Sequence, residues 1–251
     1  MDATYFGRNF GVILFKDFYS RKNILWKYVK YETLSAYISG INQNKLPRGR
    51  AIGVLNGVCF ANIFVSDPEG RGIKPHLIKG QGFKIVGIVC DGKRGLLQAF
   101  DVPIQMCQFH QVAIVRRYIT KNPRLPASKE LKDIVHNMPH TDKESFCGAL
   151  DQWHIKWKTF LNERTVNLET GKSHYTHKRL RSAYNSLIRN MPWLFTWYDN
   201  FELKMPNTNN AIEGTFTHLK NKLRNHNGLT LVNKIKFIDE FFKVSNEMNN
   251  R

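Results

Sequence analysis

The sequence MPNTNNAIEGTFTHLKNKLRNH, residues 205–226, indicates the fold more strongly than any other part of the chain. Its opening residues, 206–210, are of the kinds that end one element and cap the next. Four apolar residues then recur at i, i+4, i+7 and i+11, which predicts a helix with one buried stripe. They are Ile212, Phe216, Leu219 and Leu223.

Glu213 lies one residue off this stripe, about 100° round the predicted helix. Its row continues with Thr217, Lys220 and Arg224. A carboxylate at the edge of a buried face, with cations further along, would suit a metal-bound phosphodiester site. The same carboxylate has a structural interpretation, because Asn210-x-x-Glu213 matches a capping box with Asn in place of Ser or Thr. The stretch alone leaves both interpretations open.

The charge of the whole chain is its strongest global signal. Lys and Arg number 38 against 20 Asp and Glu, which gives a net charge of +18. A polyanion is therefore the expected partner, and nucleic acid is favoured over a membrane surface because the basic residues are spread through folded segments. The chain contains no uncharged apolar run of transmembrane length, and its four scattered cysteines form no CxxC pair. We expect a soluble, intracellular protein without a disulfide framework.

The apolar patterns predict a mixed sheet, then a block of helices, then a return to the sheet domain. The predicted strands are 10–16, 24–30, 82–90 and 102–107, and the early predicted helices are 32–41, 96–100 and 111–120. Residues 42–77, broken by Gly and Pro, are interpreted as an irregular insert with at most one hairpin. The predicted organisation is an α/β sheet domain at 1–120, an all-α insertion at 121–203, and a return at 204–251 with a closing helix at 234–244.

Two further acids accompany Glu213. Asp91 follows a buried strand, where open α/β sheets place their sites, although Asp91-Gly92 is equally typical of a turn. Asp2 lies within an apolar and aromatic run, where an acid is costly unless it is exposed or coordinated. Three acids on three elements of a strongly basic chain together favour a metal-dependent nucleic-acid enzyme.

Five segments show a family resemblance: DATYFGR, CDGKRGLLQAF, PIQMCQFHQ, YTHKRLRSAYNSL and PNTNNAIEGTFTHLKNKLRNHNGL. The chain resembles the catalytic region of Mutator-type transposases, in particular the bacterial insertion-sequence relatives of the plant Mutator-like elements. The resemblance runs from the first residues to the end, apart from residues 42–77. The ordered pair PIQMCQFHQ and PNTNNAIEG is its most specific part.

The resemblance implies a ribonuclease H-like mixed sheet flanked by helices, with an all-α insertion before the Glu helix. It implies a DDE triad of Asp2, Asp91 and Glu213 that binds two divalent cations, Mg²⁺ or Mn²⁺, for DNA cleavage and strand transfer. The implied partners are transposon ends, target DNA and further copies of the chain on that DNA. The implied location is the bacterial cytoplasm, at the nucleoid, with no membrane contact.

Cys107-x-x-His110 resembles the C/D-x-x-H signature of the family beside the active site. We expect Cys107 in the core and His110 close to the scissile phosphate, in support of the triad. A zinc site completed by His174-x-x-His177 is the alternative.

Basic residues supply the expected DNA contacts. The run Lys178, Arg179 and Arg181 in the insertion is a candidate DNA face, with a solvated helix surface as the alternative. The remaining candidates are Lys93, Arg94, Lys220 and Arg224.

Two features depart from the family pattern. The sequence begins immediately before Asp2, without the N-terminal region that recognises terminal repeats, and residues 42–77 are additional. We therefore expect a truncated transposase, and the alternative is a non-catalytic basic DNA-binding remnant that modulates a full-length enzyme. A structure-selective nuclease would fit the charge and the acids but neither of the two specific motifs.

Overall fold

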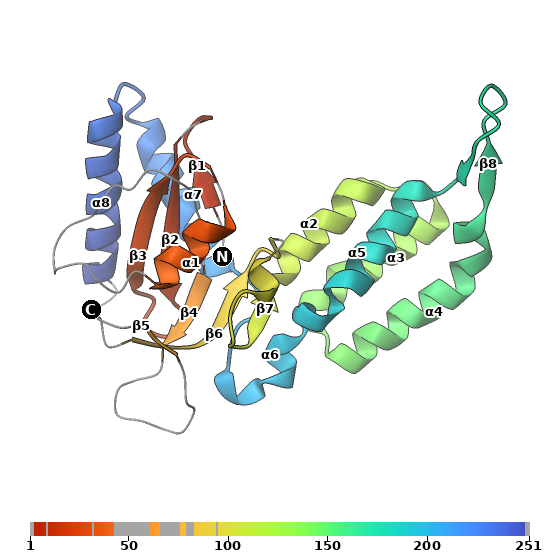
Figure 1. Cartoon of the computed structure of the whole chain (residues 1–251), viewed down its shortest axis with the longest axis horizontal. Coiled ribbons are helices and arrows are strands. Elements are labelled where there is room, and N and C mark those ends of the chain that lie inside the picture. Colours follow the sequence, from red (N-terminus) through yellow and green to blue (C-terminus); the bar gives the residue numbers. More distant parts are fainter. Residues whose placement is uncertain are drawn as a thin grey trace.

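The computed structural model describes residues 3–8, 10–31, 33–42, 61–65, 76–78, 83–93 and 95–248. Asp2 and Arg94, which are expected to belong to the site, lie outside these ranges, as does most of segment 42–77. The described chain is a mixed α/β fold in which a sheet with flanking helices adjoins a long helical insertion (Figure 1).

Seven strands form one mixed sheet. They are β1 (Ala3–Tyr5), β2 (Gly11–Asp17), β3 (Asn23–Val29), β4 (Ala61–Val65), β5 (His76–Ile78), β6 (Phe83–Cys90) and β7 (Ile104–Met106). β2 pairs antiparallel with β1 and β3 and parallel with β4, whereas β6 pairs antiparallel with β4 and β5 and parallel with β7. The four strands predicted from the sequence are confirmed as β2, β3, β6 and β7.

Strands β1 and β4 share one edge of β2. The described residues of β1 pair with residues 11–13 of β2, and β4 pairs with residues 15–17 along the same edge. Because unpaired backbone N–H and C=O groups are costly inside a protein, β4 stabilises the end of β2 by pairing with it. The interpretation of 42–77 as an irregular insert with its own hairpin is therefore wrong for its described strands: β4 and β5 both pair within the main sheet.

Helices cover the two faces of the sheet. α1 (Leu34–Asn42) lies in front of the sheet and α7 (Asn210–Arg224) behind it in Figure 1. α8 (Leu231–Met248) packs on β3, where Trp26 Nε1 and Tyr28 Oη donate to Asp239 Oδ1 over 2.7 and 2.6 Å. The apolar stripe predicted for α7 is buried in the core of this domain.

The insertion has a separate core. Its main helices are α2 (Gln108–Ile119), α3 (Pro126–Asn137), α4 (Lys143–Asn162) and α5 (Lys178–Leu194), joined by the short α6 (Thr196–Asp199), η2 (Met138–His140) and η3 (Phe201–Leu203). The 3-10 turn η1 (Leu96–Gln98) precedes β7 and contributes Leu96 to the core of the sheet domain. α2 begins three residues before its predicted start and contributes Val115 and Ile119 to this core. The helix predicted at 111–120 is therefore part of this helical core.

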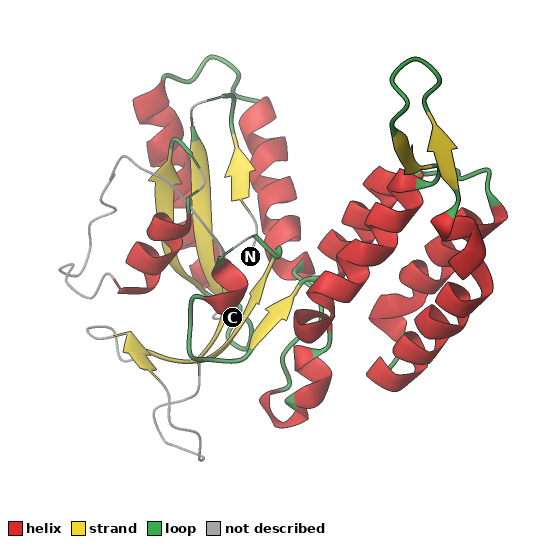
Figure 2. Cartoon of the chain, turned by 45° about the vertical axis from the view of Figure 1, so that its right-hand side comes forward, coloured by secondary structure: helices red, strands yellow, loops and turns green. Residues whose placement is uncertain are grey.

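The prediction of an all-α insertion is wrong in one respect. A hairpin of β8 (Arg164–Val166) and β9 (Ser173–Tyr175) projects beyond the helices at its far end (Figures 1 and 2). The Asn167 side chain accepts hydrogen bonds from the backbone N–H groups of Glu169 and Thr170. Gly171, at φ +65°, supplies the left-handed residue of the turn.

Candidate active site

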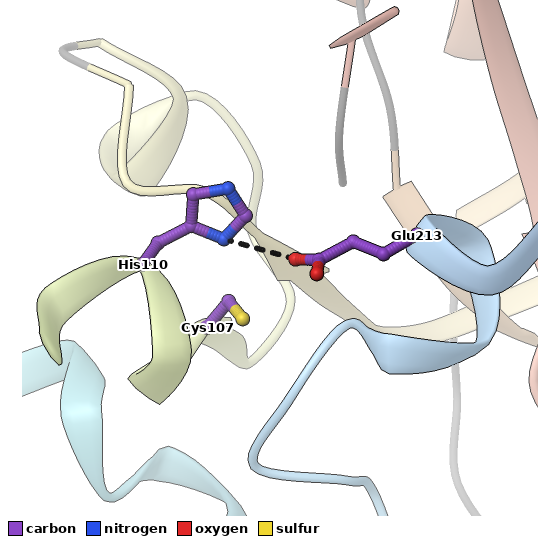
Figure 3. A group of neighbouring side chains, drawn as sticks. All are labelled: Cys107, His110 and Glu213. Carbon is purple, nitrogen blue, oxygen red and sulfur yellow. Dashed lines mark ion pairs between the residues drawn. The ribbon is translucent and has the colours of Figure 1, made fainter. Parts of the chain in front are cut away.

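Cys107, His110 and Glu213 meet where the insertion leaves the sheet domain (Figure 3). One potential ligand atom from each residue lies within 4.8 Å of the other two. His110 Nδ1 is 3.7 Å from Glu213 Oε1, and the two side chains are 26 % and 39 % exposed. Among the described residues, these three could hold a metal ion.

Hydrogen bonds between two distant segments create this meeting point. Cys107 caps the start of α2, and its Sγ accepts from the backbone N–H of Asn209, the cap of α7, over 3.3 Å. One residue further on, the N–H of Gln108 donates to the carbonyl of Asn207 over 3.0 Å. The motifs PIQMCQFHQ and PNTNNAIEG are therefore neighbours in space. Cys107 positions the helix that presents Glu213 opposite His110.

The capping interpretation of Glu213 is wrong. The cap residue of α7 is Asn209 rather than Asn210, and no side-chain hydrogen bond caps the helix. The Glu213 carboxylate faces His110 instead.

Three buried glutamines of the first motif hold the junction together. Gln105 Nε2 donates to the carbonyls of Met106 and Leu194, and its Oε1 accepts from the N–H of Trp197. Gln108 Nε2 donates to the same Leu194 carbonyl over 2.8 Å. Gln111, one turn further along α2, is bonded to Ser186 and Asn190 of α5. None of these hydrogen bonds was predicted from the sequence, although three glutamines spaced by three residues in an apolar segment are a signal of such a network.

An open groove of about 440 Å³ lies beside Glu213. Its lining is Ala3, Thr4, Phe109, His110, Ala113, Glu213, Phe216, Thr217 and Lys220. Lys220 also lines a second hollow of about 360 Å³, together with Tyr5, Phe6, Gly7, Leu223, Arg224, His226, Asn227 and Lys234. One flank of α7 thus carries Glu213 at one end and a basic, aromatic surface at the other.

Asp91 follows the last residue of β6 and does not belong to the group formed by Cys107, His110 and Glu213. Val89 of β6 is aligned with Lys16 of β2 through β4, so Asp91, two residues further on, is aligned with Leu14. Ala3 of β1 pairs with the neighbouring residue, Ile13. Its Oδ1 accepts from the N–H of Lys93 over 3.1 Å, and Gly92 has φ +84°. Asp91 therefore forms the turn that Asp91-Gly92 predicted, and its side chain is half-exposed.

The donor set limits which ion suits the three residues. Burial raises the pKa of the Cys107 thiol, so the uncharged form is favoured. A sulfur, a nitrogen and a carboxylate oxygen match Zn²⁺ or a similar ion better than Mg²⁺, which prefers oxygen. Of the three, only Glu213 is suited to Mg²⁺.

His174 and His177 do not complete a zinc site with Cys107 and His110. His177 Nε2 is 2.9 Å from a carboxylate oxygen of Glu163, and both histidines line a cavity beside Ile119 at the far end of α2. At 1.5 Å per residue, that end lies about 14 Å from His110. The four-ligand zinc interpretation is therefore wrong.

The basic run of the insertion is partly engaged inside the protein. Arg179 donates to the carbonyl of Arg117 near the end of α2, and Arg181 donates to the carbonyl of Leu161 at the end of α4. The Arg181 guanidinium also lies 3.7 Å from the centre of the Tyr175 ring. These contacts satisfy helix-terminal carbonyls. Lys178 is exposed.

Lys93, another candidate for DNA contact, is half-exposed beside the sheet. Its Nζ lies 5.8 Å from the centre of the Tyr37 ring.

Comparison of the chain with protein-family models, curated proteins and solved structures gives no match. None of the described helices has the length and apolar character needed to cross a membrane.

Proposed function

We propose that this chain is the catalytic region of a DDE transposase that cleaves DNA and joins strands at the Glu213 groove. The observation that carries the proposal is that Lys220 lines both this groove and the basic hollow next to it. The Glu213 carboxylate and His110 line one end, and Lys220 links that end to the cations Arg224 and Lys234. A hard oxygen ligand followed by positive charge is the arrangement that metal-assisted phosphodiester chemistry requires.

The strand order supports a ribonuclease H-like sheet. β1, β6 and β7 run in one direction and β2 runs against them. Asp91 follows β6, and the groove that contains Glu213 is lined by Ala3 and Thr4 of β1. In this proposal Asp2, immediately before β1, is the third acid.

Each side chain has a distinct role. Glu213 and Asp91, with Asp2, supply carboxylate oxygens to Mg²⁺ or Mn²⁺. The bound ions supply Lewis-acid stabilisation of the charge that develops on the phosphodiester. His110 donates a hydrogen bond to the scissile phosphate, and Cys107 acts through Asn209 as a positioning residue.

The basic end of the groove holds the DNA backbone. Lys220 and Arg224 are exposed on the same row of α7 as Glu213, at i+7 and i+11. The aromatic rings of Tyr5 and Phe6 line the same hollow and offer stacking faces to unpaired bases. Lys93, Arg94 and Lys178 remain further candidates for phosphate contacts.

Nicking of supercoiled plasmid and strand transfer of 3′-hydroxyl oligonucleotides test the proposal. Wild type is compared with Asp91→Asn, Glu213→Gln and the control Glu202→Gln, which makes the same change at an exposed site. We expect Mg²⁺- or Mn²⁺-dependent cleavage in wild type and control, reduced on the order of 10²–10³-fold or more in the other two.

Gel-shift binding of the same DNA separates chemistry from affinity. All four proteins should bind it, because neither active-site change removes a cation. DNA binding without cleavage in wild type would refute the enzyme and leave the basic DNA-binding remnant that modulates a full-length transposase.

A further inference from the structure

Lys16 is a cation buried in the central strand β2. Its side chain points to α7, where Nζ donates to Thr215 Oγ1 over 3.0 Å, and the residue is only 6 % exposed. Across the described part of the chain, no carboxylate pairs with this ammonium group, which leaves two of its three N–H donors for another acceptor. Buried charges are normally paired, because burial without a counter-ion is costly.

The site lies on the flank of α7 that faces away from Glu213. At about 100° per residue, Thr215 lies about 160° round the helix from Glu213, and His218 lies about 140° from it. The two flanks of α7 therefore line different hollows. Glu213 lines the groove described above, whereas Thr215 and His218 line a second hollow of about 320 Å³ on the opposite flank.

A second cation converges on Lys16. Arg21 lines the same hollow, and Lys16 and Arg21 together also line an adjoining one of about 340 Å³ beside the start of α7. Arg21 has φ +56°, a left-handed conformation that is uncommon for arginine. The Asp17 carboxylate holds this turn by accepting from the N–H groups of Tyr19 and Ser20.

We propose that Lys16 and Arg21 form a binding site for a phosphate group, separate from the Glu213 groove. The two cations outnumber the one carboxylate, Asp17, that lines the adjoining hollow, and the Asp17 oxygens accept from backbone N–H groups of the turn. An arginine offers paired donors to phosphate oxygens, and the lysine offers its remaining N–H groups from inside the protein. Burial and the nearby Arg21 charge lower the pKa of Lys16, which an incoming anion would oppose.

The phosphate could belong to a small phosphorylated molecule or to the 5′ end of a nucleic-acid strand. Thermal unfolding in EDTA at constant ionic strength tests the site with pyrophosphate, and with a short oligonucleotide that does or does not carry a 5′-phosphate. Lys16→Met removes the buried cation, and Arg21→Asn removes the other while tolerating the left-handed backbone. Lys27→Met is the matched control, a half-buried lysine of β3 that lines neither hollow.

We expect pyrophosphate to raise the Tm of wild type and Lys27→Met in a saturable way. Lys16→Met and Arg21→Asn should each weaken the apparent Kd at least about tenfold, which is 1.4 kcal/mol. A stronger response to the 5′-phosphorylated strand than to the same strand without the phosphate would identify a strand end as the source. Equal responses to the two strands would identify a small molecule.

Equal responses in all four proteins would overturn the proposal. Because Arg21 is exposed, its substitution remains informative if Lys16→Met fails to fold. The measurement needs no metal and no cleavage, and Glu213→Gln should keep the full phosphate response. The phosphate-site proposal can therefore be refuted while the proposed transposase chemistry stands, and the transposase proposal can be refuted while the phosphate site stands.

Discussion

Gln105 offers a sharp test of how the site is held together. The change Gln105→Leu keeps the approximate volume of the side chain but removes three hydrogen bonds, two of them buried and one partly buried. The Leu194 carbonyl keeps a donor in Gln108, whereas the N–H of Trp197 loses the acceptor that Gln105 supplies. Each buried group left without a partner costs about 1–3 kcal/mol, so we expect a loss of about 2–4 kcal/mol.

That loss is a large share of the 5–15 kcal/mol typical of folded domains. Urea denaturation followed by tryptophan fluorescence measures it, and Gln152→Leu on the exposed face of α4 is the control, with an expected change within about 0.5 kcal/mol. The variant should also bring Cys107 within reach of iodoacetamide, because Gln105 anchors the end of β7. A loss below about 0.5 kcal/mol for Gln105→Leu would refute this account of the junction.

Three further predictions concern the DNA surface, the Asp91 turn and the sheet domain. Lys220→Ala should lower the slope of log K against log salt for duplex DNA by about 1, in fluorescence anisotropy; an unchanged slope would remove Lys220 from the DNA surface. Gly92→Ala should reduce stability in urea by at least about 1 kcal/mol, because φ is +84° and the added Cβ would lie 2.4 Å from the Met106 side chain. The pKa of Tyr28 is raised, first by burial and then by Asp239, so folding favours the neutral phenol. Its contribution is present below the unfolded pKa, near 10, and is lost as pH rises further. Tyr28→Phe should therefore flatten the alkaline branch of a stability–pH curve, and a curve of unchanged shape would contradict this.

Periodicity predicted the elements of this protein well where it depended on near neighbours in the chain. The stripe that includes Ile212 and Phe216 is buried as expected, and the strand that ends at Cys90 is central. The position of Glu213 beside that stripe followed from the geometry of a helix alone. These features are local, since 3.6 residues per turn and two-residue alternation are properties of the backbone.

The partners of those elements could not be read from the same patterns. Arg181 was a candidate for DNA contact, and only the structure shows that its guanidinium donates to the Leu161 carbonyl at the end of α4. The strand β4 lies in a segment that was interpreted as an irregular insert, yet it pairs with β2 and β6 within the main sheet.

The candidate site also combines features that the sequence determines with features that depend on tertiary packing. The sequence by itself determined that Glu213 stands at the edge of a helix face and that Cys107 and His110 are three residues apart. Only the tertiary structure decided that the thiol of Cys107 meets the backbone of Asn209, which brings His110 opposite Glu213. Contacts between residues about a hundred positions apart depend on how the two cores pack, and no local backbone preference encodes that packing.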